Sequence, residues 1–274
     1  MQARPGHRIP ALLALLLPVG AGLIYLAIAG APQTYIITNS VALIMGGIWI
    51  MVGRAPAGSR LRRILICALL FALFIPLISG PYVNGIARWL PAGPFTLNAG
   101  ALLFPAIAVL AAQDDDFAPP MLLAALLAAM LQPDAALGFA VVFAAVGLHD
   151  AARDWRIGVT CIIGFLASIV MALRGELPPQ PFVERVLVTL AQTGSLIALL
   201  LFAALLASFC LMLFALPQDR RSRAALAGSL FGFSIMSVLS HYPSVLIGYG
   251  AAPILGYALA LGLIPRIGDA ARAN

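Results

Sequence analysis

The most constraining feature of this sequence is a series of long apolar blocks separated by short polar breaks. The ten blocks run roughly over residues 10–29, 35–52, 64–80, 95–112, 119–132, 136–149, 157–173, 186–216, 224–240 and 244–265. About 20 apolar residues in a row are enough for a helix to cross the hydrocarbon core of a bilayer. Charged residues make up only 9% of the chain, whereas soluble globular domains carry about 25%. The sequence therefore predicts an all-α, polytopic integral membrane protein of about ten transmembrane helices, which form one membrane domain over residues 1–274.

The positions of the basic residues predict how these helices are oriented. All sixteen basic residues are Arg, and basic residues are retained on the cytoplasmic side of a membrane. Ten spans with the N-terminus inside place thirteen of them in cytoplasmic segments, namely Arg4, Arg8, Arg54, Arg60, Arg62, Arg63, Arg153, Arg156, Arg220, Arg221, Arg223, Arg266 and Arg272. We therefore expect both termini in the cytoplasm. The blocks at 119–132 and 136–149 are short, so eight spans with a re-entrant hairpin around Gln132–Asp134 are the alternative.

The composition and motifs exclude several other classes of protein. The net charge is +6, but the Arg residues lie in short breaks and form no basic face interleaved with aromatic residues, as nucleic-acid binding would require. The three cysteines fall inside apolar blocks, where a cysteine acts as a small buried hydrophobe. No nucleotide, dinucleotide or zinc motif is present. We therefore expect no nucleic-acid partner, no metal and no cofactor.

Polar residues collect in four segments that the predicted topology places on the outer side. In the first segment, Asn84 and Gly85 favour a tight turn, and Arg88 and Trp89 are typical of an anchor at the membrane interface. The alternative is that Asn84, Arg88 and Trp89 bind a lipid headgroup, with Arg88 on an anionic group or phosphate.

The second segment contains a predicted helix break at Pro133 and Asp134. The proline ends one helix, and the aspartate is a good cap for the next. An ion or proton site at a broken helix is the alternative.

The remaining two segments are rich in proline and glycine. Residues 174–185 contain three prolines and predict an extended loop, in which Glu176 and Glu184 are either solvated or a carboxylate pair for acid–base chemistry. In residues 241–253, Pro243, Gly248 and Gly250 predict an interruption of a helix near its outer end. We interpret His241 as an interfacial residue rather than a catalytic base.

These four segments, in this order, resemble the SEDS family (shape, elongation, division and sporulation). The family patterns N-G-x-x-R-W, L-Q-P-D-L-G-T-A, H-T-D-F and S-Y-G-G-S-S correspond here to VNGIARWLPAGPFTLNAG from Val83, LQPDAALGFAVV from Leu131, LPPQPFVERVLVTLAQTG from Leu177 and YPSVLIGYGAAP from Tyr242. The similarity spans about residues 80 to 265. It implies a ten-helix fold with both ends inside the bacterial inner membrane. It also implies polymerisation of glycan strands from lipid II, a polyprenyl-diphosphate-linked sugar, together with a penicillin-binding-protein partner.

The sequence departs from the family pattern at the residues to which the family's reaction is attributed. The family's essential Asp corresponds to Val183, with Glu184 one residue later. Its paired acids correspond to Ala191–Gln192, and its Q-P-S-E corresponds to residues 98–101, which read NAGA. The long outer loop is reduced to about a dozen residues. The resemblance thus supports the fold and the compartment, and argues against the chemistry.

Three functions follow from this reading. The first is a catalytically silent scaffold or accessory subunit that works with membrane lipids and another membrane protein. The second is a lipid-linked glycan transferase that uses Glu184 or Asp134 as its acid. The third is a transporter or lipid flippase with Asp134, Arg88 and His241 around an outward cavity.

Overall fold

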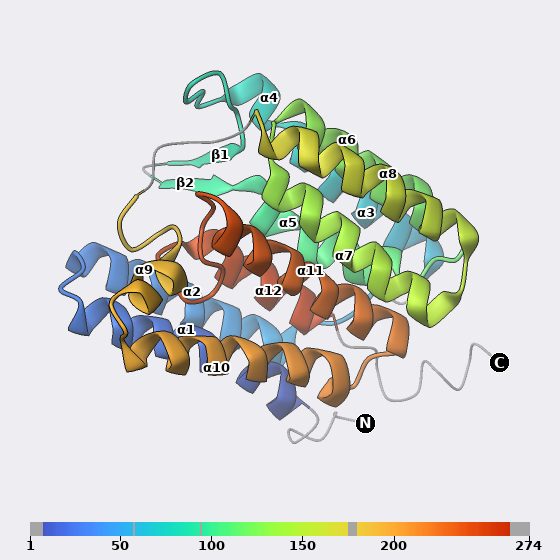
Figure 1. The fold of residues 1–274 in the computed structure, drawn as a ribbon. Coiled ribbons are helices and arrows are strands. Elements are labelled where there is room, and N and C mark those ends of the chain that lie inside the picture. Colours follow the sequence, from blue (N-terminus) through green and yellow to red (C-terminus); the bar gives the residue numbers. More distant parts are fainter. Residues whose placement is uncertain (1–7, 57, 94, 175–179, 264–274) are drawn as a thin grey trace.

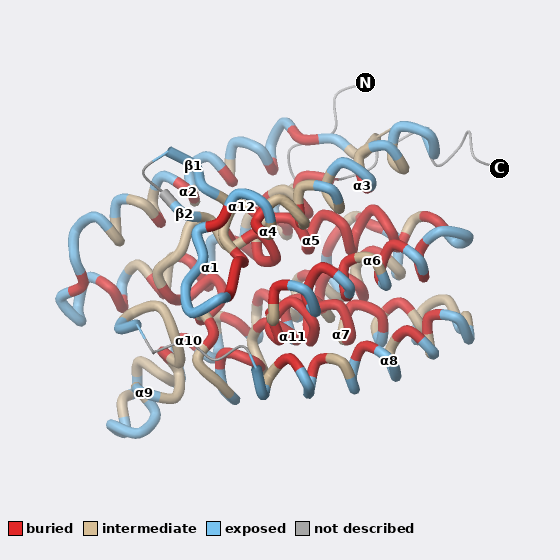
Figure 2. The backbone as a smooth tube through the Cα atoms, turned by 90° about the horizontal axis from the view of Figure 1, so that it is seen from above, coloured by how far each residue is buried: buried red, intermediate tan, exposed pale blue. Residues whose placement is uncertain are grey.

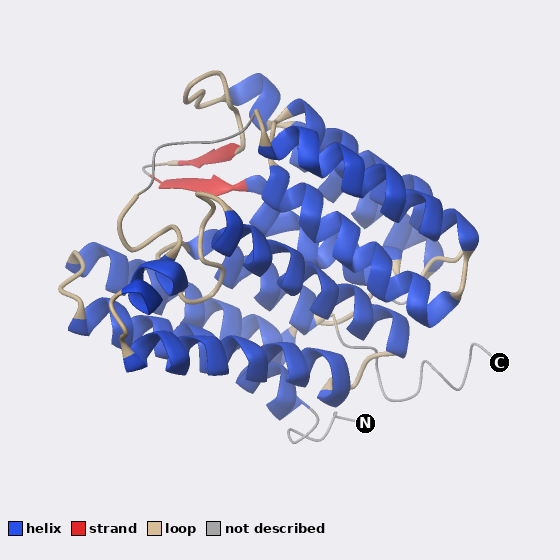
Figure 3. Cartoon of the chain, viewed as in Figure 1, coloured by secondary structure: helices blue, strands red, loops and turns tan. Residues whose placement is uncertain are grey.

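The computed structural model describes residues 8–56, 58–93, 95–174 and 180–263. Over these residues the chain forms an elongated helical bundle with one small β-hairpin (Figures 1 and 3). The helices are α1 (Ile9–Ile28), α2 (Gln33–Val52), α3 (Ser59–Phe74), α4 (Pro76–Ser79), α5 (Ala99–Ala111), α6 (Ala118–Leu131), α7 (Ala135–Ala152), α8 (Trp155–Ala172), α9 (Val186–Gln192), α10 (Leu196–Cys210), the π-helix η2 (Leu211–Ala215), α11 (Arg220–Leu239) and α12 (Ala251–Gly262). The strands are β1 (Trp89–Ala92) and β2 (Phe95–Asn98), which pair antiparallel.

Ten of these helical segments correspond in order to the ten predicted apolar blocks. Seven are long and apolar enough to cross a membrane: Ile9–Ile28, Gln33–Val52, Ser59–Ser79, Ala135–Ala152, Trp155–Ala172, Leu196–Ala215 and Arg220–Leu239. Three more, α5, α6 and α12, are apolar but shorter. The predicted class, an all-α polytopic membrane protein, is confirmed.

Three predicted blocks differ from the helices in detail. Block 95–112 begins with the strand β2, and only its remainder is helical. Block 186–216 is divided into α9 and α10 because Gly194 adopts a positive φ of 65° and Ser195 caps the next helix. Block 244–265 starts with seven non-helical residues before α12. The end of that block, from residue 264, lies outside the described residues.

The most buried helices lie in the middle of the bundle (Figure 2), and many large apolar side chains of the outer helices are exposed. Helices α5, α7 and α11 are buried along most of their length, whereas α2, α3, α8 and α10 have few buried residues. Small residues allow α7 and α11 to pack closely. A Cβ added to Gly232 would lie 2.4 Å from the carbonyl oxygen of Phe139. Close packing over small residues is typical of helix interfaces in membranes, where outer faces meet lipid.

Arg and Asp residues from several helix breaks meet at one end of the bundle. Arg63 Nε binds Asp114 Oδ2 at 2.6 Å, and Arg220 binds Asp150 at 2.8 Å. Arg221 binds Asp115, so this end joins the first part of α3, the break before α6, the end of α7 and the start of α11. The described breaks that the Arg residues assign to the cytoplasm therefore lie together at one end of the bundle. Which side of the membrane this end faces stays a prediction. Arg4, Arg266 and Arg272 lie outside the described residues.

Helices α6 and α7 each run between the two ends of the bundle. Helix α6 starts beside Asp114 at the Arg-rich end, turns at Gln132–Asp134 at the opposite end, and α7 returns to Asp150. A re-entrant hairpin would enter and leave the membrane on the same side at a shallower depth. This geometry favours ten passes over eight.

Candidate functional site

The site lies at the end of the bundle opposite the Arg–Asp cluster, where the four polar segments meet. The first segment turns at Asn84 and Gly85, whose φ angles are 51° and 77°. Asn84 is exposed, and Trp89 is half-buried at the start of β1. Arg88, between them, is only 3% exposed.

The burial of Arg88 contradicts an exposed anchor. Its guanidinium donates a hydrogen bond to the Pro133 carbonyl at 3.3 Å and lies over the rings of Tyr242 at 5.0 Å and Trp89 at 5.8 Å. An interfacial anchor would direct its charge outward; binding of a lipid headgroup by Asn84, Arg88 and Trp89 stays a prediction. Arg88 instead connects the hairpin segment to the break between α6 and α7.

Asp134 is the N-cap of α7. Its Oδ1 accepts a hydrogen bond from the backbone N–H of Leu137 at 3.1 Å, which satisfies one of the free donors at the helix start. The side chain is 1% exposed. Next to it, the Tyr242 hydroxyl accepts a hydrogen bond from the backbone N–H of Ala135 at 3.1 Å. Pro133 and Asp134 therefore occupy the helix break, with the carboxylate in a capping position.

The third and fourth segments are bonded to each other through their backbones. The N–H of Ser244 donates to the Val183 carbonyl at 2.7 Å, and the N–H of Tyr249 donates to the Phe182 carbonyl at 2.8 Å. Gly248 lies where a Cβ would come within 2.9 Å of the same Val183 carbonyl. Non-helical backbone at membrane depth must satisfy its polar groups within the protein, and these two segments do so for each other. Pro243, Gly248 and Gly250 all lie in the non-helical stretch before α12.

Asn39 of α2 holds the same stretch from the other side. Its amide nitrogen donates to the Gly248 carbonyl at 3.0 Å, and its amide oxygen accepts from the N–H of Gly250 at 3.0 Å. The ring of Tyr35 stacks on that of Tyr249 with centroids 3.7 Å apart. The sequence reading missed Asn39. The position of this polar residue inside the apolar block 35–52 could have identified it, because a polar side chain at membrane depth is costly unless it has a partner.

The two candidate acids of the third segment are not placed as a pair. Glu184 is half-buried, and its carboxylate accepts a hydrogen bond from the N–H of Gln180 at 3.3 Å. Burial raises the pKa of Glu184 to about 7, against the opposing effects of that hydrogen bond and of the charges of His241 and Arg88. His241 is half-buried near this loop. Glu176 lies outside the described residues.

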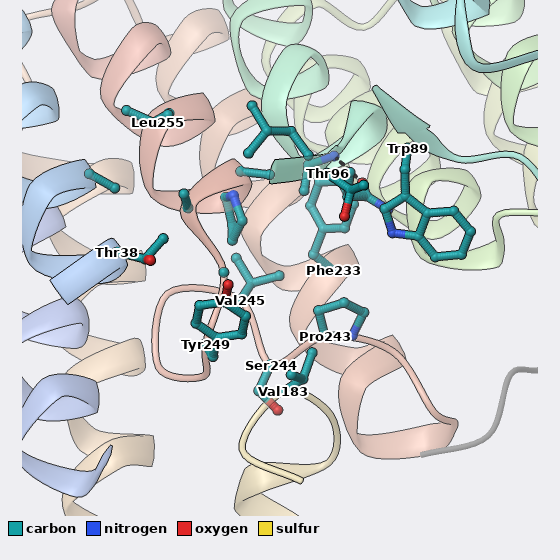
Figure 4. A pocket seen from close by; sticks show the side chains of 18 of the residues that line it. Thr38, Trp89, Thr96, Val183, Phe233, Pro243, Ser244, Val245, Tyr249 and Leu255 are labelled. Atoms are coloured by element: carbon teal, nitrogen blue, oxygen red, sulfur yellow. Dashed lines mark hydrogen bonds between the residues drawn. The ribbon is translucent and has the colours of Figure 1, made fainter. Parts of the chain in front are cut away.

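A cavity of about 500 Å³ lies between α2, the hairpin, α12 and the stretch before α12. Figure 4 shows Thr38 of α2 on the left and Trp89 of β1 on the right, with Val183 and Ser244 below the centre of the view and Leu255 at the upper left. Asp134 and Val183 line the cavity, and Glu184 is not part of its lining. The volume falls in the range of small-molecule sites, about 300–1,000 Å³.

The fold is similar to that of solved membrane proteins, although the sequence is distant from them. No family model and no curated protein sequence matches the chain. A crystal structure of a point mutant of RodA, the rod shape determining protein of Thermus thermophilus, matches with a TM-score of 0.68 and 18% identity over 100% of both chains. A second crystal structure of RodA from the same organism matches with a TM-score of 0.62 and 20% identity, over 96% of this chain and 97% of that one. A structure described as showing how a peptidoglycan synthase complex coordinates polymerisation and crosslinking also has a TM-score of 0.62, at 18% identity over 96% and 97% of the two chains.

These matches define the class of fold. The chain is a multi-pass membrane protein whose fold is SEDS-like over its whole length. Among solved structures its fold matches that of RodA, at an identity that supports the fold alone.

Proposed function

We propose that this chain is a SEDS-like protein of the cell envelope, located in the bacterial inner membrane, that acts as a catalytically silent scaffold or accessory subunit. The main support for this proposal is the identity of the residue at the position of the family's essential acid. Val183 lines the cavity, and it has no atom that accepts a proton.

Neither neighbouring carboxylate replaces that acid. A general base must lie within hydrogen-bond reach of the hydroxyl that it deprotonates. Glu184 is outside the cavity lining, and its carboxylate is bonded to the N–H of Gln180. Asp134 lines the cavity, but one of its oxygens caps α7. The short connection between α8 and α9 also leaves little wall to hold a large polar headgroup, and positioning is a major part of such catalysis.

The test is an assay of glycan-chain formation by the purified protein with lipid II. We expect no chains from the parent protein, under conditions in which a polymerising SEDS protein gives them. Val183→Asp is the informative variant because it restores a carboxylate to the cavity wall. Chains made by the parent and abolished by Glu184→Gln would overturn the proposal.

A second candidate function, a lipid-linked glycan transferase, is favoured by one observation. Burial raises the pKa of Glu184 to about 7, the range in which a general base works well near neutral pH. If Glu184 is the base, activity should rise with pH through about 7, and Glu184→Gln should remove both the activity and that dependence. Activity without such a profile would count against this candidate.

We also infer a membrane-protein partner, such as a single-span penicillin-binding protein. The support is the similarity to a structure of a peptidoglycan synthase complex. The partner should copurify in fixed stoichiometry from native membranes in mild detergent. Recovery of the chain alone after crosslinking in intact membranes would contradict a permanent subunit role.

A further inference from the structure

The basic side chains at the Arg-rich end of the bundle fall into two groups. Four Arg residues near the ends of α7, α8 and α11 pair with acids. The pairs are Arg153–Asp150, Arg156–Asp154, Arg220–Asp150 and Arg221–Asp115. The first three helices differ, because the chain has no Asp or Glu before Asp114. Their basic residues are therefore compensated only by acids from later segments or by a ligand.

Asp114 compensates two charges of α3 and leaves the others. Its carboxylate binds Arg63 Nε at 2.6 Å, and Arg62 Nη2 lies 3.8 Å from the same oxygen. Arg54 and Arg60 are exposed, and neither guanidinium forms an ion pair or hydrogen bond with the part of the chain that the structure describes. Two cations of the same short break are thus available to an anion.

Arg8 brings a third cation to the same place. Its guanidinium donates hydrogen bonds to the carbonyl of Gly53, at 2.8 Å, and to that of Ile50, so it lies at the end of α2, beside the residue that precedes Arg54. Burial and then the positive charge of Arg54 lower the pKa of Arg8. Like charges gathered in one break repel one another, and a bound anion relieves that repulsion.

These cations adjoin an apolar surface at the edge of the membrane. Helix α2 has 20 residues, about the length that crosses the hydrocarbon core, so Arg54, two residues beyond its end, lies at headgroup depth. Large apolar side chains of both helices are exposed next to the break: Met51 at 43%, Val52 at 62%, Leu61 at 58% and Ile64 at 56%. In a membrane helix such side chains meet acyl chains.

From these charges and this surface we propose that the break between α2 and α3 is a binding site for an anionic phospholipid. Its phosphate accepts hydrogen bonds from Arg54 and Arg60, the charge of Arg8 adds attraction, and its acyl chains lie along α2 and α3. A lipid fits better than an acidic protein segment, because charge and exposed apolar surface adjoin within one helical turn. The site lies at the opposite end of α2 from the cavity, so its failure would leave the proposed function untouched.

The first experiment compares two lipids that differ in net charge. The purified full chain in a nonionic detergent is titrated with phosphatidylglycerol or with phosphatidylcholine of the same acyl chains, and bound lipid is counted by native mass spectrometry. We expect a Kd at least about tenfold lower for phosphatidylglycerol. Equal affinities would overturn the proposal, as would displacement of the lipid by excess inorganic phosphate at matched ionic strength, because the site would then take a free anion.

The second experiment separates this site from the overall charge of the protein. Arg54→Gln with Arg60→Gln should weaken phosphatidylglycerol binding by about tenfold or more, since each Arg near the headgroups contributes on the order of a factor of five. Arg153→Gln with Arg220→Gln is the matched control, because it removes two charges at the same end of the bundle from residues that are paired with Asp150. The control should bind within about twofold of the parent. Equal weakening in both pairs would overturn the proposal.

The third experiment identifies the occupant in intact membranes. A photocrosslinking amino acid in place of Leu61 is activated in cells whose phospholipids carry radioactive phosphate, and radioactivity should then migrate with the chain. A crosslinked polypeptide in place of the lipid would show that a protein segment occupies the break, and the proposal would be wrong.

Discussion

Replacement of Asn39 by Leu should loosen the wall of the cavity more than any other single change on α2. The Asn39 side chain is 1% exposed and makes two hydrogen bonds of 3.0 Å, one to Gly248 and one to Gly250. Double-mutant cycles on hydrogen bonds between membrane helices average about 0.6 kcal/mol and reach about 1.7 kcal/mol. Two such bonds give an expected loss of about 1–3 kcal/mol in the free energy of unfolding.

The assay combines unfolding by SDS in mixed micelles with hydrogen exchange of residues 241–250. Asn39→Leu should lower the unfolding free energy by that amount and speed exchange in the stretch before α12. Thr38→Val is the control, because among the described residues the Thr38 hydroxyl bonds only to the Thr34 carbonyl of its own helix. It should change the free energy by less than about 0.5 kcal/mol. If Asn39→Leu matched this control in both measurements, the bonds from α2 would not hold the cavity wall, and the reasoning would be refuted.

Three further predictions concern the packing, the ion pairs and the orientation. Gly232→Ala should destabilise the protein by about 1–3 kcal/mol in the same SDS titration, because the added Cβ would meet the backbone of α7 at 2.4 Å. The hydrogen bond from Arg63 holds the pKa of Asp114 below its usual value. The stability that this carboxylate contributes is therefore fully present above its unfolded-state pKa, about 3.9. It is lost as the pH falls through the lower folded-state pKa. Thermal unfolding at a series of pH values should show this acid loss in the parent and less of it in Asp114→Asn. Single cysteines at positions 58 and 220 should react with a membrane-impermeant reagent only after the inner face is opened; labelling from outside at either position would contradict the ten-span orientation.

The helices were predictable from the sequence because each rests on a local property. Length and hydropathy alone locate all ten apolar segments, and the Arg positions predict which breaks meet at one end. The interruptions inside three of these blocks were less visible. Gly194 and Gly250 adopt positive φ angles, but glycine is common inside membrane helices, so its presence does not mark a helix end.

The site was only partly predictable because its contacts join distant parts of the chain. The bonds from Ser244 to Val183 and from Tyr249 to Phe182 use backbone atoms, which leave no trace in residue identity. Arg88 was misread for a related reason. Beside a Trp, an Arg is typical of a membrane interface, and only the fold shows that its acceptor is the Pro133 carbonyl, 45 positions away.

The fold also explains why the resemblance to the SEDS family extends over four segments although the family's acidic residues are replaced in them. The matching residues have structural roles here: Asp134 caps α7, Arg88 bonds the Pro133 carbonyl, and Gly248 allows close approach to Val183. Each satisfies a backbone group or a steric limit of this fold, and backbone polar groups at membrane depth must be satisfied within the protein. The side chain of Val183 satisfies no such requirement, because its backbone carbonyl makes the contact with Ser244. An acid at that position can therefore be lost without loss of the fold, and for this reason the similarity of the four segments supports the fold more strongly than the chemistry.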